Sequence, residues 1–379
     1  MKTNKEIIEF IKEIFNQSVI PLHEPCFGGN EKRYIEECID STFVSSIGNY
    51  VDKIEKDILK YSGTKYAIAV VNGTSGLQVA LQLVGVAHGD EVITQSLSFV
   101  ATSNSIHFAG AAPVFVDVDY DTMGMSPKFL LNFLKKNAEI KNNHCINKST
   151  GKRISACLPM HTFGFPCRID EIAEICQSWR IPLVEDAAEA LGSNYKGNKI
   201  GSFGDLSVFS FNGNKIVTSG GGGMIVTNNE KLAKAAKHVT TTAKLPHTYE
   251  FIHDEIGYNF RMPNINAAML CAQLEQLDDF IQNKRELAEI YAEFFLDQPI
   301  FRSENKETTA SYWLNCLEFN NLEERNTFLK EAHEQGVFCR SIWTPSHFLP
   351  MYLTCQKDNL ENTTKLYERI VNIPSSVRK

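Results

Sequence analysis

The sequence predicts an α/β protein with a mostly parallel sheet covered by helices, followed by a smaller α+β domain. Between about residues 66 and 228, short apolar runs alternate with helical patterns, which is typical of a parallel sheet. After the polar stretch at residues 240–248 the pattern changes to one long helix and then to mixed short elements. We therefore expect a large domain over residues 1–244 and a small C-terminal domain over residues 245–379.

The individual elements follow from the apolar periodicity and from the polar residues that interrupt it. Charged side chains alternate with isoleucines in residues 1–16, which predicts an amphipathic surface helix. Strands are predicted at residues 66–71, 91–94, 113–116, 154–160, 182–185, 206–211 and 223–227. Helices are predicted between them at residues 75–84, 99–109, 169–179 and 230–238. Residues 141–153 are predicted as a polar surface excursion, and residues 264–291 as one long helix.

The composition is that of an ordinary soluble globular protein and excludes bulk disorder. The chain has 379 residues, of which 43% are hydrophobic and 22% charged, so it is long enough to bury a sizeable core. Its 38 basic and 45 acidic side chains give a formal net charge of −7 without long basic runs. The sequence therefore lacks the electrostatic footprint of a nucleic-acid-binding protein.

Neither a membrane span nor a secretory signal is predicted. Charges interrupt the N-terminal apolar run, and polar residues together with Gly110 and Pro113 break up the uncharged stretch at residues 92–116. The ten cysteines are scattered, with no CxxC pair and no Cys/His cluster of zinc spacing. We therefore expect reduced thiols, a cytoplasmic protein and no bound metal.

Residues that carry chemistry are expected just after the predicted strands, because open α/β sheets bind ligands outside the carboxyl ends of their strands. The first such segment, residues 72–76 (NGTSG), places Gly73, Thr74 and Ser75 at the start of a helix. Free amides and hydroxyls at a helix N-terminus suit a phosphate group. An ordinary capped helix start explains the same residues when the segment is taken alone.

Two further segments offer groups for a flat heterocycle. Residues 184–189 (VEDAAE) deliver Asp186 to the edge of the sheet, where a carboxylate can hold a proton on a ring nitrogen. A helix-capping aspartate is the competing explanation. Phe99 follows the strand at residues 91–94 and is placed to stack on an aromatic ligand, although a lone aromatic side chain more commonly belongs to the core.

A fourth segment, residues 210–215 (SFNGNK), places Lys215 in a polar, glycine-rich turn between two buried strands. A desolvated amine is a good imine-forming nucleophile, whereas most lysines simply face solvent. The glycine run at residues 220–223 lacks GxGxxG spacing and leads into a strand, so it does not predict a dinucleotide site. Taken together, the four segments supply a phosphate cradle, a stacking ring, an anion and a lysine, which are the parts that hold pyridoxal 5′-phosphate (PLP).

Over nearly its whole length the chain resembles the DegT/DnrJ/EryC1/StrS family of fold-type I sugar aminotransferases. The resemblance is carried by the EDAAE strand end, the SFxxxK turn and the GYNFRM segment within residues 72–81, 98–102, 184–191, 210–227 and 257–268. It implies that Lys215 bonds to the PLP cofactor and moves a proton between the cofactor and the sugar carbon. It also implies that Asp186 pairs with the pyridine nitrogen and that Phe99 stacks on the ring.

The same resemblance implies a homodimer with two shared active sites. The phosphate of the cofactor would be held by Gly73, Thr74, Ser75 and Ser210. The partner subunit's Asn259 would reach the same phosphate, so that neither subunit has a complete site alone.

Four other polar residues are candidates for contacts with the cofactor, the substrate or the partner subunit. Glu189 stands where many relatives have Gln or His beside the 3-oxygen of the cofactor, and a carboxylate there repels a phenolate unless it is protonated or turned toward substrate. His161 and His347 are candidates for substrate contact, with a structural role as the alternative. Arg261 is a candidate for a substrate diphosphate or for an ion pair at the subunit interface.

The resemblance is greatest to the subgroup that acts on UDP-2-acetamido-2,6-dideoxy-4-keto sugars of legionaminic acid or bacillosamine synthesis, through residues 20–25, 44–48 and 211–215. We therefore expect glutamate to give its amino group to the cofactor, which then aminates C4 of a nucleotide-linked keto sugar for a surface glycan or a nonulosonic acid. GDP- or dTDP-linked sugars and reaction at C3 are alternatives. A sugar dehydratase is disfavoured, because the resembling dehydratases carry His at the position of Lys215, and a non-catalytic regulator is a third hypothesis.

Overall fold

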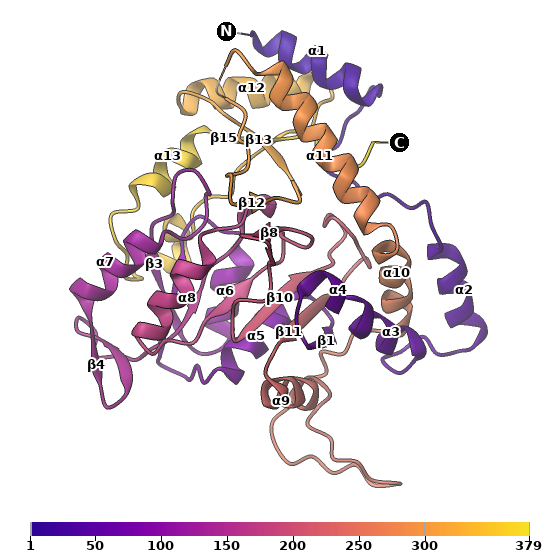
Figure 1. Cartoon of the computed structure of the whole chain (residues 1–379), viewed down its shortest axis with the longest axis vertical. Coiled ribbons are helices and arrows are strands. Elements are labelled where there is room, and N and C mark those ends of the chain that lie inside the picture. The colour runs from indigo at the N-terminus through magenta and orange to yellow at the C-terminus, as the bar shows by residue number, and fades with distance from the viewer. Residues whose placement is uncertain (1, 299, 379) are drawn as a thin grey trace.

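The computed structural model describes residues 2–298 and 300–378, and its centre is a mixed β-sheet (Figure 1). Four strands run in the order β1 (Tyr66–Val70), β11 (Gly223–Thr227), β10 (Leu206–Ser210) and β7 (Val184–Asp186). Three more run in the order β3 (Ala112–Val116), β2 (Glu91–Gln95) and β6 (Ile154–Leu158). Parallel bridges from Cys157 to Leu183 and from Met160 to Asp186 join the two rows into one sheet.

The sheet is mostly parallel, as predicted, with one reversed strand. β2 pairs in parallel with β3 and β6, and β10 pairs in parallel with β7. β11 is antiparallel to both β1 and β10. The reversal arises because residues 211–222 connect β10 to β11 without a crossover helix, and a parallel pair needs such a crossover.

The helices predicted between the strands are present with small shifts at their ends. They are α5 (Gly73–Leu83), α6 (Val100–Phe108), α8 (Ile169–Ser178) and α9 (Glu230–Thr240). α5 is capped at its N-terminus by Asn72, whose side-chain oxygen accepts a hydrogen bond from the Ser75 amide at 2.8 Å. Its apolar face packs on the sheet, where Leu77 shares a core with Val92 and Val208. The carboxyl ends of the strands are thereby fixed next to the N-terminus of α5.

Several elements were not predicted from the sequence. They are α2 (Glu31–Asp40), α3 (Asn49–Asp57), α4 (Leu59–Ser62), α7 (Pro127–Asn137), η1 (Thr162–Gly164), β8 (Asn194–Tyr195), β9 (Asn198–Lys199) and β12 (Thr308–Thr309). The excursion expected at residues 141–153 overlaps a hairpin of β4 (Ala138–Lys141) and β5 (His144–Asn147). The long helix expected at residues 264–291 is two helices, α10 (Asn264–Leu274) and α11 (Leu277–Phe294), which meet at Glu275 and Gln276.

The C-terminal region forms a second, smaller sheet in the order β13 (Asn315–Glu318), β15 (Ile370–Ile373) and β14 (Arg340–Ser341). The other elements of this region are α12 (Leu322–Glu334), η2 (Ser346–Phe348), η3 (Pro350–Tyr352) and α13 (Glu361–Arg369). The N-terminal helix α1 (Asn4–Phe15) packs here, beside α12 in Figure 1, and its Ile8 shares a core with Phe328 and Val371.

Packing crosses the predicted domain boundary in both directions. α1 lies on the C-terminal sheet, while α10 packs against α2 and α3 in the N-terminal half of the chain. The division into residues 1–244 and 245–379 therefore stays a prediction. Among the described residues, no helix has the length and apolar character needed to cross a membrane.

Candidate active site

The predicted site residues meet in a cavity of about 320 Å³ at the carboxyl ends of β7 and β10. Its walls include Gly73, Thr74, Phe99, Asp186, Glu189, Ser210 and Lys215 from the prediction, and Asn72, Leu77, Ala101, Thr102, Met160, Ala188, Asn212, Asn214, Gly222, Trp313 and Trp343 in addition. A larger hollow of about 470 Å³ lies between α1 and α12, but its walls contain none of the predicted site residues. We therefore place the candidate site in the smaller cavity.

One end of the cavity is the N-terminus of α5, facing Ser210 at the end of β10. Backbone amides in the first turn of a helix have no partner within the helix, and they carry its positive dipole end. Gly73 and Thr74 line the cavity, and a Cβ on Gly73 would come within 3.1 Å of the Ser210 Cβ. Ser75 does not line the cavity, and its amide is taken by Asn72. The backbone around Gly73 and the Ser210 hydroxyl therefore form a cradle with room for a phosphate oxygen.

Gly223, the first residue of β11, allows this strand to pass close to the start of α5. A Cβ on Gly223 would lie 2.7 Å from the carbonyl oxygen of Asn72, closer than such atoms approach. Gly223 also pairs with Val70 and with Ser210, so it lies between the two strands that border the cradle. The glycine is therefore required where the backbone of β11 passes the α5 turn.

Asp186 lies on the floor of the cavity with its carboxylate held in place. One oxygen accepts a hydrogen bond from the Thr102 hydroxyl at 2.7 Å, and the other accepts one from the Ala188 amide at 3.2 Å. Burial raises the pKa of the Asp186 carboxyl, and the Thr102 hydrogen bond opposes that rise. A buried anion of this kind is complementary to a protonated ring nitrogen.

Lys215 extends from the turn after β10 into the same cavity. Its Nζ lies 3.2 Å from Oε1 of Glu189 and 4.0 Å from the centroid of the Trp313 ring. The other carboxylate oxygen of Glu189 accepts a hydrogen bond from the Phe163 amide at 3.0 Å. Burial raises the pKa of Glu189 to about 7, against the opposing charge of Lys215.

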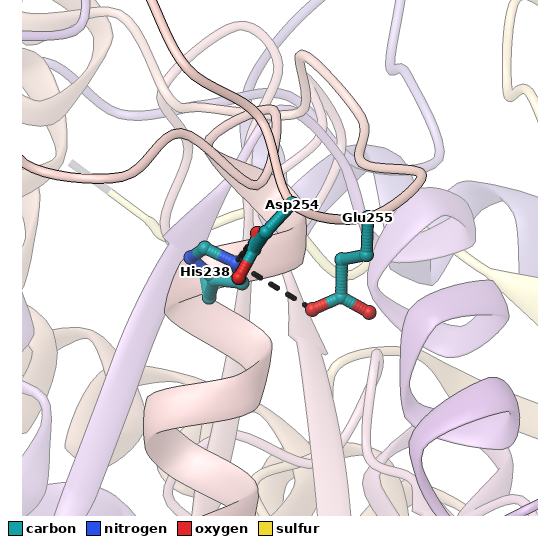
Figure 2. A group of neighbouring side chains, drawn as sticks. All are labelled: His238, Asp254 and Glu255. Atoms are coloured by element: carbon teal, nitrogen blue, oxygen red, sulfur yellow. Dashed lines mark hydrogen bonds and ion pairs between the residues drawn. The ribbon is translucent and has the colours of Figure 1, made fainter.

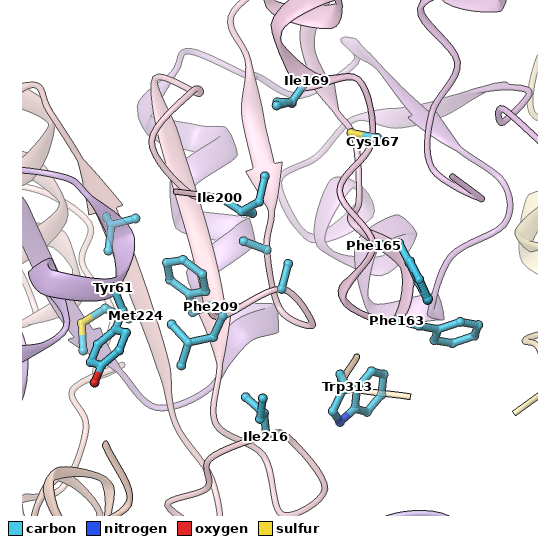
Figure 3. Close-up of a cluster of buried hydrophobic side chains, with 14 of the residues drawn as sticks. Tyr61, Phe163, Phe165, Cys167, Ile169, Ile200, Phe209, Ile216, Met224 and Trp313 are labelled. Atoms are coloured by element: carbon cyan, nitrogen blue, oxygen red, sulfur yellow. The ribbon is translucent and has the colours of Figure 1, made fainter. Parts of the chain in front are cut away.

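Two tryptophans complete the walls and were not predicted as site residues. Trp313 and Trp343 both line the cavity and both approach Phe163, at ring-centroid distances of 6.3 and 4.7 Å (Figure 3 shows Phe163 and Trp313). Phe99 also lines the cavity, half exposed, with its ring 6.5 Å from that of Trp343 in an edge-on contact. The chain has 3 Trp, and two of them line the cavity. The rarity of tryptophan was the one feature of the sequence that could have drawn attention to these positions.

His161 has a structural environment rather than the substrate contact considered from the sequence. Its ring is completely buried, with Nε2 3.2 Å from Glu185 and Nδ1 accepting a hydrogen bond from the Cys167 amide at 3.3 Å. Because the Cys167 amide donates to Nδ1, Nε2 is the nitrogen that donates to Glu185. His161 does not line the cavity, and we assign it to the support of Glu185.

His347 also lies outside the cavity lining. Its Nδ1 is 2.7 Å from the Ser96 hydroxyl, and burial lowers the pKa of the imidazole to about 4. The neutral ring joins the segment after β14 to the end of β2. The structure therefore gives His347 a packing role, although the neighbouring Trp343 does face the cavity.

Asn259 is exposed and Arg261 is half-buried, and neither side chain lines this cavity. Nε and Nη2 of Arg261 donate to Oδ1 of Asn259 at 3.0 and 2.9 Å, which leaves the Asn259 amide nitrogen free of this contact. Arg261 thus orients Asn259 within its own subunit.

The segment leading to Asn259 extends away from the end of α9 (Figure 1). Its base is tied to the helix by His238, whose Nε2 lies 2.7 Å from Asp254 and 3.5 Å from Glu255 (Figure 2). These partly exposed side chains make a hydrogen-bonded anchor for the segment.

The donor set of the cavity fits PLP. The α5 turn with Ser210 suits a phosphate, Asp186 suits a protonated pyridine, and Lys215 supplies an amine in the same cavity. Bound PLP supplies an electron sink for carbon acids. A cavity with these groups at the carboxyl edge of a helix-covered sheet defines a PLP-dependent enzyme of fold type I.

The chain belongs to the DegT/DnrJ/EryC1/StrS aminotransferase family, which it matches over residues 25–378. It is therefore a PLP-dependent nucleotide-sugar aminotransferase. It is 39% identical to a GDP-perosamine synthase of Escherichia coli O157:H7 over 88% of this chain and 87% of the relative. It is 34% identical to a GDP-perosamine synthase of Vibrio cholerae over 94% of each chain.

The fold agrees with solved structures of related enzymes. The aminotransferase TlmJ from Streptoalloteichus hindustanus superposes with a TM-score of 0.85 at 27% identity, over 94% of this chain and 93% of the other. The fold class expected from the sequence is thus confirmed.

Proposed function

We propose that the enzyme transfers an amino group from glutamate to C4 of a GDP-linked 4-keto hexose. The observation that supports this substrate is the 39% identity, over most of both chains, to an enzyme named for a GDP-linked amino sugar. A second enzyme of that name is 34% identical over 94% of each chain. This proposal replaces the UDP-linked legionaminic acid or bacillosamine precursor expected from the sequence.

A UDP-linked 2-acetamido sugar is the second candidate. Residues 20–25, 44–48 and 211–215 favour it through their resemblance to the UDP-sugar subgroup. Of these segments, the last contains Lys215 and two cavity residues, Asn212 and Asn214. The residues that would hold PLP are the same for a GDP-linked and a UDP-linked sugar. The preference between the two sugars therefore depends on the residues that contact the substrate.

We assign a different role in the reaction to each group of residues in the cavity. The α5 turn and Ser210 would hold the phosphate of PLP, and the negative charge of Asp186 would keep the ring nitrogen protonated. Phe99 lies at the cavity wall to stack on the ring. Lys215 would carry the proton between the cofactor and the sugar carbon, and the buried Trp313 ring covers one side of its amine.

We further propose a cytoplasmic homodimer in which each subunit lends Asn259 to the other site. Asn259 is exposed and outside the cavity of its own subunit, with its amide nitrogen turned away from Arg261. The same segment presents Phe251 and Ile256, which are 81% and 88% exposed. Exposed apolar side chains of this size are typical of a surface that a partner covers.

A spectroscopic assay with a panel of sugars tests the substrate. Glutamate alone should convert the bound cofactor to its aminated form, and a GDP-linked 4-keto-6-deoxy sugar should return it. UDP- and dTDP-linked 4-keto and 3-keto sugars should return it at least about tenfold more slowly, equivalent to about 1.4 kcal/mol. Faster return by a UDP-linked 2-acetamido sugar would establish the second candidate instead.

A further inference from the structure

Trp313 and Glu189 hold the amine of Lys215 from two sides. The Trp313 ring lies 4.0 Å from Nζ, and its indole Nε1 donates to the carbonyl oxygen of Asn214 at 2.7 Å. The tryptophan therefore fixes both the backbone of the lysine turn and the charged end of the lysine. Held in this way, Nζ points at one oxygen of Glu189, 3.2 Å away.

Glu189 is arranged so that this oxygen is available to Lys215. Its Oε2 is engaged by the Phe163 amide at 3.0 Å, which sets the plane of the carboxyl group and leaves Oε1 facing Nζ. The side chain is 2% exposed, so water does not compete strongly for the contact. Burial raises the pKa of Glu189 to about 7, so the carboxyl group gains or loses a proton at little cost near neutral pH.

The charged groups around this pair come from three parts of the chain. Asp186, at the end of β7, raises the pKa of Glu189, and Lys215 lowers it. His23, from the segment after α1, lies near Lys215 with both ring nitrogens shielded and without hydrogen-bond partners among the described residues. His161 is tied to Glu185. Lys215 is thus the group positioned to exchange a proton with Oε1.

We propose that Glu189 is a catalytic residue that takes a proton from Nζ of Lys215 and later returns it. The N–H bond breaks with its electron pair left on nitrogen, and an O–H bond forms on Glu189. An ammonium and a carboxylate become an amine and a carboxylic acid, so no net charge enters the buried cavity. The free amine then has the electron pair with which it accepts a proton from carbon.

This inference rests on Lys215 being the reactive lysine, and it does not depend on which sugar is the substrate. A glutamine at this position would offer a hydrogen bond to Lys215, but it would have no proton to give or take at neutral pH.

Infrared spectroscopy of the full-length protein tests the proton position directly. Between pH 5 and pH 9 the wild-type protein should show a carboxylic acid band that disappears near pH 7, and Glu189→Gln should lack it. Asp358→Asn is the matched control, because burial raises the pKa of Asp358 to about 6 and this side chain does not line the cavity. The band near pH 7 should persist in Asp358→Asn. Its persistence in Glu189→Gln, or its absence from the wild type, would overturn the proposal.

The half-reaction with glutamate gives a second test. Glu189→Gln should slow it about tenfold or more and remove an ionisation near pH 7 from its pH profile, whereas Glu189→Asp should retain part of the rate because it keeps a proton acceptor. A wild-type rate and pH profile in Glu189→Gln would refute the role. Borohydride reduction tests separately whether Lys215 is the lysine that bonds PLP. Bonding of PLP to another lysine would refute that assignment, whatever the role of Glu189.

Discussion

Two glutamates lie four positions apart beside the cavity, and both are buried, but their surroundings give them opposite tendencies. Glu185 accepts hydrogen bonds from the amides of Gly201, Phe203 and Gly204, from the Ser207 hydroxyl and from His161. Glu189 accepts from one amide and from Lys215. Although burial alone raises the pKa of Glu185, its donors bring that pKa below the ordinary value, whereas the pKa of Glu189 rises to about 7.

The comparison teaches that burial alone does not decide whether a carboxyl group is charged. Five donors around Glu185 replace the water that it loses, so the residue is a fixed anion that holds residues 201–204 against the sheet. With fewer donors, Glu189 keeps the freedom to change protonation state. One region of the site is therefore structural, and the other is suited to proton transfer.

The largest expected effect on activity comes from removing Lys215, the partner of Glu189. Lys215→Ala should abolish transamination while the fold is retained, because it removes the amine that we propose bonds PLP and leaves Glu185 untouched. The measurement combines circular dichroism with an amino-transfer assay. Borohydride reduction and peptide mapping of the wild type should place the cofactor on Lys215, and bonding at any other lysine would contradict the assignment.

Asp186→Asn should have the next largest effect. The amide cannot stabilise a protonated pyridine by charge, so the half-reaction with glutamate should slow by about 10²-fold or more while PLP still binds. Stopped-flow absorbance measures the rate, and equilibrium dialysis measures the bound cofactor. A half-reaction at nearly the wild-type rate would show that the Asp186 charge has no such function.

The two glutamates should differ in their effect on stability. Glu185→Gln leaves several buried donors facing a neutral amide and should lower the free energy of unfolding by about 2–4 kcal/mol. Glu189→Gln keeps an acceptor for the Phe163 amide and should change it by no more than about 1 kcal/mol at pH 7. Urea denaturation of both variants gives the comparison, and equal losses would remove the distinction between the two regions.

The pH dependence of stability should also have opposite signs. The folded-state pKa of Glu189 is raised above 4.5, so between about pH 4.5 and 7 the folded protein binds a proton that the unfolded protein has lost. The contribution of Glu189 to stability therefore falls as the pH rises from about 4.5 to 7. The folded-state pKa of Glu185 is lowered, so its contribution is present above 4.5 and is lost as the pH falls through the folded-state value. Relative to Glu189→Gln, the wild type should lose about 1–3 kcal/mol between pH 4.5 and pH 8.

Subunit mixing is expected to give the smallest signal. If Asn259 serves the partner's site, exchange between inactive Lys215→Ala and impaired Asn259→Ala should restore about a quarter of the sites, since half of the dimers are mixed and each has one intact site. The experiment requires that Asn259→Ala alone is well impaired, because one phosphate hydrogen bond contributes only about 1–3 kcal/mol. Verified mixed dimers without activity would show that Asn259 acts within its own subunit or only structurally.

Strand-end positions made much of the cavity predictable from the sequence. Gly73, Phe99, Asp186, Glu189 and Lys215 follow apolar runs, and a parallel sheet brings such positions to one edge. The family resemblance, rather than periodicity, supplied their roles. The direction of β11 was not predictable, because an apolar run contains no information on whether its strand is reversed.

The residues that sequence analysis missed come from distant parts of the chain. Trp313 and Trp343 reach the cavity from beyond the predicted domain boundary, so no local pattern connects them to Lys215. His161 also follows a strand, as the site residues do, but its ring contacts Glu185 and does not line the cavity. Side-chain direction at a strand end depends on the register of the neighbouring strands, which the sequence alone does not specify.

The hydrogen bond from Trp313 to Asn214 joins residues 99 positions apart. A chain leaves the ribosome N-terminus first, so the lysine turn, the aspartate and the α5 turn have all emerged well before their tryptophan wall. On the nascent chain, the cavity lacks this wall until residue 313 has been synthesised and packed. Completion of the cavity is therefore a late event in the synthesis of this protein, because it requires residues from the C-terminal quarter of the chain.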